Sequence, residues 1–247
     1  MSPDLASLGV DFYPLGPARQ PQTLFVLGGR APDSPWLSDF AARNSLAAYA
    51  VDSGVAVCRR AGLTPLAIVG DRDSAAAEDW EWALRLGARE FVYPSGKDLT
   101  DFQLALGLID KKDRCGLVLT GCFGGRFDHL FSITGTFTAV RPLCMIDEQE
   151  GLFLVEPGRE MRVVFKKKPV AVSLLPLSEE CTGVRIGGVR WPLGGVTIER
   201  ASPWTVSNET LPGQDGTCAK NVSVSCESGV MGFYWSFHAD LQSGAWS

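Results

Sequence analysis

The sequence has few of the residues that build zinc sites and disulfide frameworks. It contains two histidines, and none of its seven cysteines forms a C-x-x-C pair or has a neighbouring histidine to complete a zinc site. Structural zinc needs such spacings, so a zinc finger and a histidine-rich metal centre are excluded. Because an odd number of cysteines cannot all pair within one chain, we expect a reducing, cytoplasmic location.

Long hydrophobic runs and an excess of positive charge are also missing. No window approaches the roughly 18 apolar residues that a membrane-spanning helix needs, and Met1-Ser2-Pro3-Asp4 does not resemble a signal peptide. Lys and Arg number 23 against 28 Asp and Glu, and Lys166-Lys167-Lys168 is the one dense basic run. We therefore expect neither membrane insertion nor a nucleic-acid partner.

Motifs of several common enzyme classes are absent as well. The chain has no G-x-x-x-x-G-K-[ST] phosphate loop, no H-R-D kinase loop and no G-x-S-x-G nucleophile turn. These absences disfavour P-loop nucleotidases, protein kinases and serine hydrolases. Any phosphate chemistry must use another arrangement of residues.

The 247 residues and 45% hydrophobic content are enough for one large domain or two smaller ones. After a lead-in of about 20 residues that we predict to be irregular, short apolar runs alternate with stretches of helical spacing, which is typical of a layered α/β sheet. The predicted strands are Leu24–Leu27, Leu46–Val51, Leu66–Val69, Glu90–Tyr93, Leu117–Thr120 and Leu143–Ile146. The clearest predicted helices are Ala75–Leu86 and Thr100–Ile109.

The pattern changes after about residue 148 to period-2 alternation with frequent Gly and Pro. Leu152–Val155, Arg162–Phe165, Asn221–Ser225 and Met231–Phe237 are predicted strands of an antiparallel sandwich or barrel. The sequence thus predicts a Rossmann-like layered α/β domain over residues 1–148 and an all-β domain over residues 149–247.

Two acidic segments carry the first sign of chemistry. Asp71 and Asp73 flank Arg72 directly after a predicted strand, and Asp98 and Asp101 stand three apart at the start of a predicted helix. Carboxylates gathered without histidine or thiolate select Mg²⁺. Each segment alone has a second interpretation, because Asp98 can cap its helix and the other two can shape a turn.

A third segment, Gly124-Gly125-Arg126-Phe127-Asp128-His129, follows the predicted strand Leu117–Thr120. It supplies a flexible loop, a guanidinium for phosphate and a further carboxylate at the same sheet edge. The alternative is a glycine-rich turn with a surface Arg–Asp pair. Together the three segments favour magnesium and phosphate chemistry.

The order of these segments, followed by a β region with the pair Ser207-Asn208, resembles the thiamine pyrophosphokinase family. The resemblance runs from about Val26 to Trp235. It implies transfer of a pyrophosphoryl group from ATP to the hydroxyethyl oxygen of thiamine, with release of AMP. It also implies a homodimer whose active site lies between the α/β domain of one subunit and the β domain of the other.

The same resemblance implies the roles of individual residues. Asp71, Asp73 and Asp101 would bind magnesium directly or through water, with Asp98 nearby. Arg126 would bind the polyphosphate, and Asp128 would contact the nucleotide or orient the loop. The other residues expected at the ATP site are Asp52, Ser74, Lys97, Thr100, Gln103 and His129.

The β region contains candidate residues for binding the thiamine rings. Trp191 and Trp204 offer aromatic faces that suit a cationic thiazolium or an aminopyrimidine, and Ser207 and Asn208 offer hydrogen bonds. Trp191 fits equally well as a core residue.

Two departures from the family pattern leave alternatives open. Ser53 stands where a glycine usually follows Asp52 and narrows the approach of a ligand to the backbone, and Arg72 stands where an apolar residue is usual. The Arg72 guanidinium can bind phosphate, pair with either aspartate or point to solvent. The rival functions are a pyrophosphokinase for another hydroxyalkyl heterocycle, such as a pterin, and a binding protein without turnover.

Overall fold

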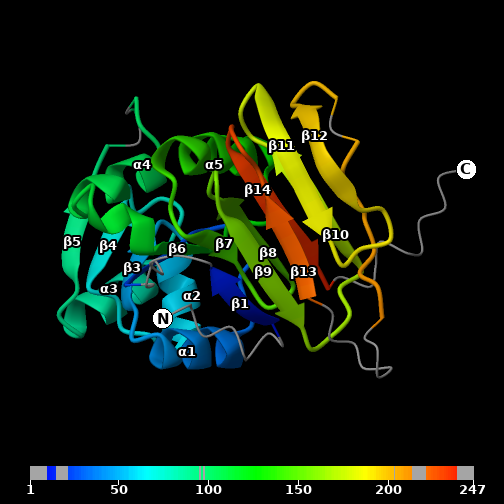
Figure 1. Ribbon diagram of the computed structural model, residues 1–247. Coiled ribbons are helices and arrows are strands. Elements are labelled where there is room, and N and C mark those ends of the chain that lie inside the picture. Colours follow the sequence, from blue (N-terminus) through cyan, green and yellow to red (C-terminus); the bar gives the residue numbers. More distant parts are fainter. Residues whose placement is uncertain are drawn as a thin grey trace, which may run out of the picture. The chain divides into compact units, whose positions relative to one another are not determined.

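The computed structural model describes residues 10–14, 22–94, 96, 98–202, 204–212 and 221–237 (Figure 1). The chain divides into two compact units: residues 19–148 form the first, which we call the parallel unit, and residues 149–247 with the N-terminal segment form the second, the antiparallel unit. Among the helices described, none combines the length and apolar character needed to cross a membrane.

The parallel unit is built on strands in the order β7-β6-β2-β3-β4-β5, each parallel to its neighbours. The strands are β2 (Thr23–Val26), β3 (Ala47–Val51), β4 (Ala67–Gly70), β5 (Arg89–Val92), β6 (Leu117–Thr120) and β7 (Cys144–Ile146). The α-helices are α1 (Ser34–Arg43), α2 (Gly54–Ala61), α3 (Ala77–Arg85), α4 (Asp101–Ala105) and α5 (Phe127–Val140), with short 3-10 turns η2 (Leu106–Leu108) and η3 (Asp113–Gly116).

The central strands read as unbroken apolar runs because helices cover both of their faces. Every residue of β2, β4 and β6 is buried. Helices α1, α2 and α3 lie on one side of these strands, and α4 and α5 lie on the other (Figure 1). Phe102 of α4 packs edge-on against Phe25 of β2, with ring centroids 6.4 Å apart.

The strand order reverses at β2, and this reversal positions the site. The chain proceeds from β2 outward through β3, β4 and β5, then returns to add β6 and β7 on the opposite side of β2. In open parallel sheets, ligands bind beyond the carboxyl ends of the two strands at such a switch. The loops after β2 and β6 are therefore the expected walls of a crevice.

The antiparallel unit contains a sheet in the order β1-β9-β13-β11-β12 and a group of strands in the order β10-β14-β8. The strands are β1 (Val10–Pro14), β8 (Glu150–Val155), β9 (Glu160–Phe165), β10 (Ala171–Pro176), β11 (Glu180–Gly187), β12 (Leu193–Glu199), β13 (Asn221–Ser225) and β14 (Met231–Ser236). Phe165 of β9 contacts Phe233 and Trp235 of β14, so an aromatic core joins the two groups.

Most predicted elements are present, with two corrections. The predicted irregular lead-in contains β1, which pairs with β9 in the antiparallel unit, so this segment does not group with the residues up to 148 as expected. The helix predicted over Thr100–Ile109 is only α4 followed by η2. Asp98 therefore precedes the helix and does not share its first turn with Asp101.

Candidate active site

A cavity of about 700 Å³ lies in the parallel unit. The loops that follow β2, β3, β4 and β6 line it, together with the starts of α4 and α5. Of the residues that the sequence predicted for the ATP and magnesium site, nine line this cavity: Asp52, Asp71, Ser74, Asp98, Thr100, Asp101, Arg126, Asp128 and His129. The topology thus brings together side chains that are up to 77 positions apart in sequence, from Asp52 to His129.

Three predicted residues do not line the cavity or cannot be placed. Asp73 is not among the lining residues, and its backbone N–H donates to Oδ1 of Asp71 at 2.9 Å. Gln103 is also outside the lining. Lys97 lies outside the described residues.

Thr100 and Gln103 have a local structural role. The Thr100 hydroxyl accepts a hydrogen bond from the Gln103 backbone N–H at 3.3 Å, and the Gln103 side chain accepts one from the Thr100 N–H at 3.0 Å. This reciprocal pair is a capping box, and it satisfies N–H groups that the first turn of α4 leaves unpaired. It fixes the start of α4, where Asp101 lines the cavity. Thr100, not Asp98, is the N-cap.

The loops lie so close together that two glycines have no room for a side chain. A Cβ at Gly54, the first residue of α2, would be 1.9 Å from the carbonyl oxygen of Val26. A Cβ at Gly29 would be 2.6 Å from the carbonyl oxygen of Gly121. In both cases the obstructing atom is backbone. Gly29 lines the cavity and Gly54 follows the lining residue Ser53, so main chain in close contact forms or supports these parts of the wall.

Arg126 and Asp128 form a bidentate pair at the start of α5. Nε and Nη2 of Arg126 donate to the two Asp128 oxygens at 3.1 and 2.5 Å. The hydrogen bond from Arg126 holds the pKa of the Asp128 carboxyl below its usual range, and the same bond raises the pKa of Arg126. Both side chains are exposed at the rim. Asp128 therefore holds the guanidinium, and its two predicted roles, contact with the nucleotide and orientation of the loop, stay predictions.

Sequence reasoning missed a buried ion pair that fixes the loop after β2. Nη2 of Arg30 donates to Oδ2 of Asp147 at 2.5 Å, and the Asp147 side chain is fully buried. The backbone N–H of Arg30 also donates to the carbonyl of Phe123 at 2.7 Å. No short motif links residues 117 positions apart, so no sequence signal pointed to this pair.

Cys122 also lines the cavity, and its environment excludes a nucleophilic role. Burial raises the pKa of its thiol well above the usual range, and the charge of Asp147 adds to this effect. A thiol needs to be thiolate to react, so Cys122 is a neutral packing group.

The cavity suits a hard cation with few protein ligands. Its acidic lining consists of oxygen donors from Asp52, Asp71, Asp98, Asp101 and Asp128. Within the described residues, no three Asp, Glu, His or Cys side chains are gathered as a ready-made metal cage. Oxygen donors of this kind fit magnesium, which is commonly held by one or two carboxylates and completes its octahedron with water and phosphate oxygens.

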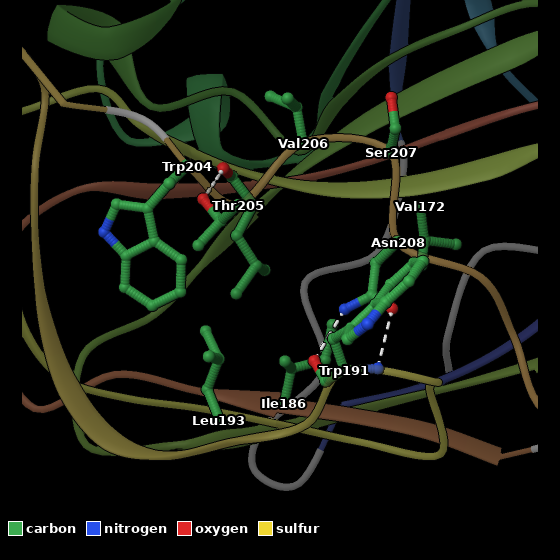
Figure 2. Close-up of a pocket in the computed structure, with 10 residues that line it drawn as sticks. Val172, Ile186, Trp191, Leu193, Trp204, Thr205, Val206, Ser207 and Asn208 are labelled. Atoms are coloured by element: carbon green, nitrogen blue, oxygen red, sulfur yellow. Dashed lines mark hydrogen bonds between the residues drawn. The ribbon is translucent and has the colours of Figure 1, made fainter.

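A second pocket, of about 410 Å³, lies in the antiparallel unit. Its lining includes all four residues predicted to bind thiamine: Trp191, Trp204, Ser207 and Asn208. Figure 2 shows Trp204 on one side and Trp191 on the other, with Leu193 and Ile186 between them. The side chains of Trp191 and Trp204 are exposed, 52% and 57%, so Trp191 is not a core residue.

The Asn208 amide is hydrogen-bonded to the backbone of Trp191. Its Nδ2 donates to the Trp191 carbonyl at 2.7 Å, and its Oδ1 accepts from the Trp191 N–H at 3.2 Å (Figure 2). The Arg190 guanidinium lies 4.8 Å from the Trp191 ring centroid. Ser207 has a left-handed φ of 60°, and its hydroxyl points away from both tryptophans. In this structure the Asn208 amide therefore holds the Trp191 backbone, and its contact with a substrate stays a prediction.

The fold and the two sites define a class of protein. A carboxylate-lined cavity at the switch point of a parallel sheet, with a guanidinium at its rim, is suited to a metal-dependent phosphotransferase. The pocket between two tryptophans, in a separate unit, is suited to a flat acceptor ring.

The chain belongs to the thiamin pyrophosphokinase family. Residues 41–145 match the thiamin pyrophosphokinase catalytic domain, and residues 160–231 match the thiamin pyrophosphokinase vitamin B1 binding domain. Together the two matches cover more than half of the chain, and they fall on the cavity and the second pocket respectively. The chain thus carries both domains of a thiamine diphosphokinase enzyme.

Individual relatives agree with this assignment. A thiamine pyrophosphokinase of Bacillus subtilis is 28% identical over 166 residues, which is 65% of this chain and 77% of that protein. The structure of thiamin pyrophosphokinase from Geobacillus thermodenitrificans has 26% identity and a TM-score of 0.70 over 88% of this chain and 99% of its own. The Candida albicans enzyme, at 15% identity, has the same fold with a TM-score of 0.71 over 96% and 92%.

Proposed function

We propose that this chain transfers a pyrophosphoryl group from ATP to thiamine, giving thiamine diphosphate and AMP, with Mg²⁺ at the acidic edge of the cavity. The observation that carries the proposal is the coincidence of each site with one family domain. All the carboxylates that line the cavity lie within residues that match the catalytic domain, and the tryptophan pocket lies within those that match the vitamin B1 binding domain.

Asp71 and Asp101 are the proposed magnesium ligands, because both line the cavity and they come from different loops. Asp73 lies beside Asp71 but does not line the cavity, so we assign it an indirect contact through water. The bound cation would neutralise phosphate charge. Arg126, held in place by Asp128, would stabilise the negative charge that develops on the transferred group.

The hydroxyl group of thiamine must lose a proton when it attacks the phosphorus. Asp71 and Asp98 both line the cavity, and either carboxylate can accept that proton if the hydroxyl comes within hydrogen-bond distance. In the second pocket, the exposed ring of Trp204 can attract the thiazolium cation by a cation–π interaction.

We also propose that the parallel unit is Rossmann-like, because its strand order reverses at β2.

One assay tests the function directly. Purified protein is given ATP and Mg²⁺ with thiamine, with a pterin alcohol or with no acceptor, and AMP is measured by a coupled reaction. We expect AMP only with thiamine. AMP formed only with the pterin would assign a different acceptor, and thiamine binding without AMP would contradict catalysis.

The shared active site implied by the family resemblance is also a proposal. If the cavity of one subunit works with the tryptophan pocket of another, mixing Asp71→Asn with Trp204→Ala at a thiamine concentration below the wild-type KM would raise the rate above that of either variant alone, because each mixed dimer contains one intact site. Two chains that each form a complete site would show no such increase. Sedimentation measured at the same concentrations would establish whether a dimer is present.

We propose a cytoplasmic location from the state of the cysteines. Those in the described part of the chain are free, and burial raises the pKa of the Cys58 thiol to about 12. Such thiols suit a reducing compartment. Fractionation of cells that contain the protein would test the location.

A further inference from the structure

Arg72, the residue between the two aspartates, does not line the cavity and is anchored by residues of β5 and α3. Its guanidinium pairs with the Glu90 carboxylate on β5, and its Cζ lies 5.7 Å from the ring centroid of Trp80 on α3. Nε1 of Trp80 donates to the same Glu90 oxygen at 2.5 Å. Arg72 thus neither pairs with its neighbouring aspartates nor lines the cavity. Of the roles left open from sequence, pairing with a neighbouring aspartate is not found; the guanidinium is half exposed, and it is held by Glu90 and Trp80.

The backbone at Arg72 is held in an unusual conformation. Its φ is 68°, in the left-handed region that residues with a Cβ rarely occupy. Asp71 accepts the hydrogen bond from Asp73 across Arg72, so Arg72 is the central residue of this tight turn. The conformation of a tight turn sets the direction of the side chains that flank it. Asp71 is the flanking residue that lines the cavity.

The anchor is suited to hold this conformation. Trp80 is buried, with 3% exposure, and β5 is fixed to β4 by parallel pairing that places Glu90 opposite Ile68. Hydrogen bonding from Arg72 and Trp80 lowers the pKa of Glu90, so the carboxylate stays charged at neutral pH. Arg72 therefore contacts two partners whose own positions are determined by the core and the sheet.

We propose that Arg72 is a positioning residue: its contacts with Glu90 and Trp80 hold the Asp71 turn so that the Asp71 carboxylate faces the cavity and binds the magnesium–nucleotide. This inference rests on the proposed function of the cavity. It predicts that loss of the anchor weakens magnesium activation more than it weakens thiamine binding.

The test compares Arg72→Met and Glu90→Gln with the wild-type chain. AMP formation is measured against free Mg²⁺ at fixed ATP, and separately against thiamine. We expect the Mg²⁺ concentration for half-maximal rate to rise about three- to tenfold in each variant, with the KM for thiamine unchanged within twofold. Because both variants break the same contact, the double variant should resemble the single ones. Arg72→Lys, which keeps the charge, should recover part of the loss.

Arg59 provides a matched control. It is an exposed arginine of the same unit and pairs with Asp79 at 2.8 Å, between α2 and α3. Arg59→Met removes a comparable surface ion pair away from the Asp71 turn. It should leave the Mg²⁺ dependence unchanged.

The proposal is overturned if Glu90→Gln, which preserves the shape of the side chain, leaves the Mg²⁺ dependence within twofold of wild type. It is also overturned if Arg59→Met shifts that dependence as much as Arg72→Met does. Titration with Mn²⁺, followed by electron paramagnetic resonance, measures metal affinity without turnover. A lower affinity for Mn²⁺ in the variants would support the proposal. If the wild type itself makes no AMP, the proposed function fails, whereas the variant-to-wild-type ratio of Mn²⁺ affinity still tests Arg72.

Discussion

The two units of this chain make their sites in different ways. In the parallel unit the loops that line the cavity include glycines packed closely against neighbouring backbone, and several carboxylates lie among the other lining residues. In the antiparallel unit the pocket wall is side chain, with tryptophans and aliphatic residues on strands and on the segment around Trp204. Polyphosphate needs fixed dipoles and charge, whereas a heterocycle needs flat apolar surface.

This difference determines how each site tolerates change. A main-chain wall cannot accept an added methyl group without moving a strand, but its charges can be altered without disturbing the packing. A side-chain wall can lose a ring and keep its backbone. Substitutions in the parallel unit should thus divide sharply into those that affect turnover and those that affect folding, and substitutions in the second pocket should mainly affect affinity.

The largest expected effect is on turnover in the parallel unit. Asp71→Asn should lower kcat by about a hundredfold or more, because it removes a charged ligand from the proposed magnesium site, with the fold retained. Rates are measured at saturating ATP and thiamine, and circular dichroism checks the fold. Asp73→Asn is expected to have a smaller effect, since Asp73 does not line the cavity. Near-normal rates in both variants would contradict the metal assignment.

Next in size is the effect of a single methyl group added directly behind the cavity lining, at Gly54, which follows the lining residue Ser53. Gly54→Ala should lower the free energy of unfolding by on the order of 3 kcal/mol, since its Cβ would be 1.9 Å from the Val26 carbonyl oxygen. Urea unfolding measures the change. Gly107→Ala is the control, because nothing lies within 4 Å of its added Cβ. Equal stability of the two variants would argue against a wall of tightly packed backbone.

A smaller effect is expected in the tryptophan pocket. Trp204→Ala should raise the KM for thiamine about tenfold through loss of the aromatic face, with kcat less affected. Trp191→Ala should have less effect, because Arg190 already occupies one face of that ring. Steady-state kinetics with thiamine as the varied substrate distinguishes the two. A larger effect at Trp191 would reverse this ranking.

The smallest expected effect concerns the pH dependence of stability. The pKa of Glu90 is lowered from 4.5, first by its hydrogen bond from Arg72. A carboxyl with a depressed folded-state pKa stabilises the protein above its unfolded pKa, and this contribution disappears as the pH falls through the lower folded value. Glu90→Gln should therefore cost under about 1 kcal/mol at pH 7 and less at pH 3. A cost that grows on acidification, measured by urea unfolding, would show that the sign is wrong.

Most strands of the fold could be predicted from the local pattern of apolar residues in the sequence. The inner strands β2, β3, β4, β6 and β7 could be predicted because both faces of a parallel sheet are buried, which leaves apolar runs; the edge strand β5 is largely exposed. Strand β1 could not, because Val10–Pro14 has no pattern of its own and gains its partners only from β9. The end of α4 could not be predicted either, because apolar residues with helical spacing continue beyond Ala105, where the structure changes to a 3-10 turn.

The sequence by itself determined the chemistry of this protein: the types of its reactive side chains, their order along the chain and the family to which that order corresponds. Only the tertiary structure decided which of those side chains meet. It brought Asp71 and Asp101 to one cavity, assigned Asn208 to Trp191, and gave Arg72 partners on α3 and β5. Side-chain identity is a local property of the chain, whereas distance and orientation depend on contacts between residues far apart in it.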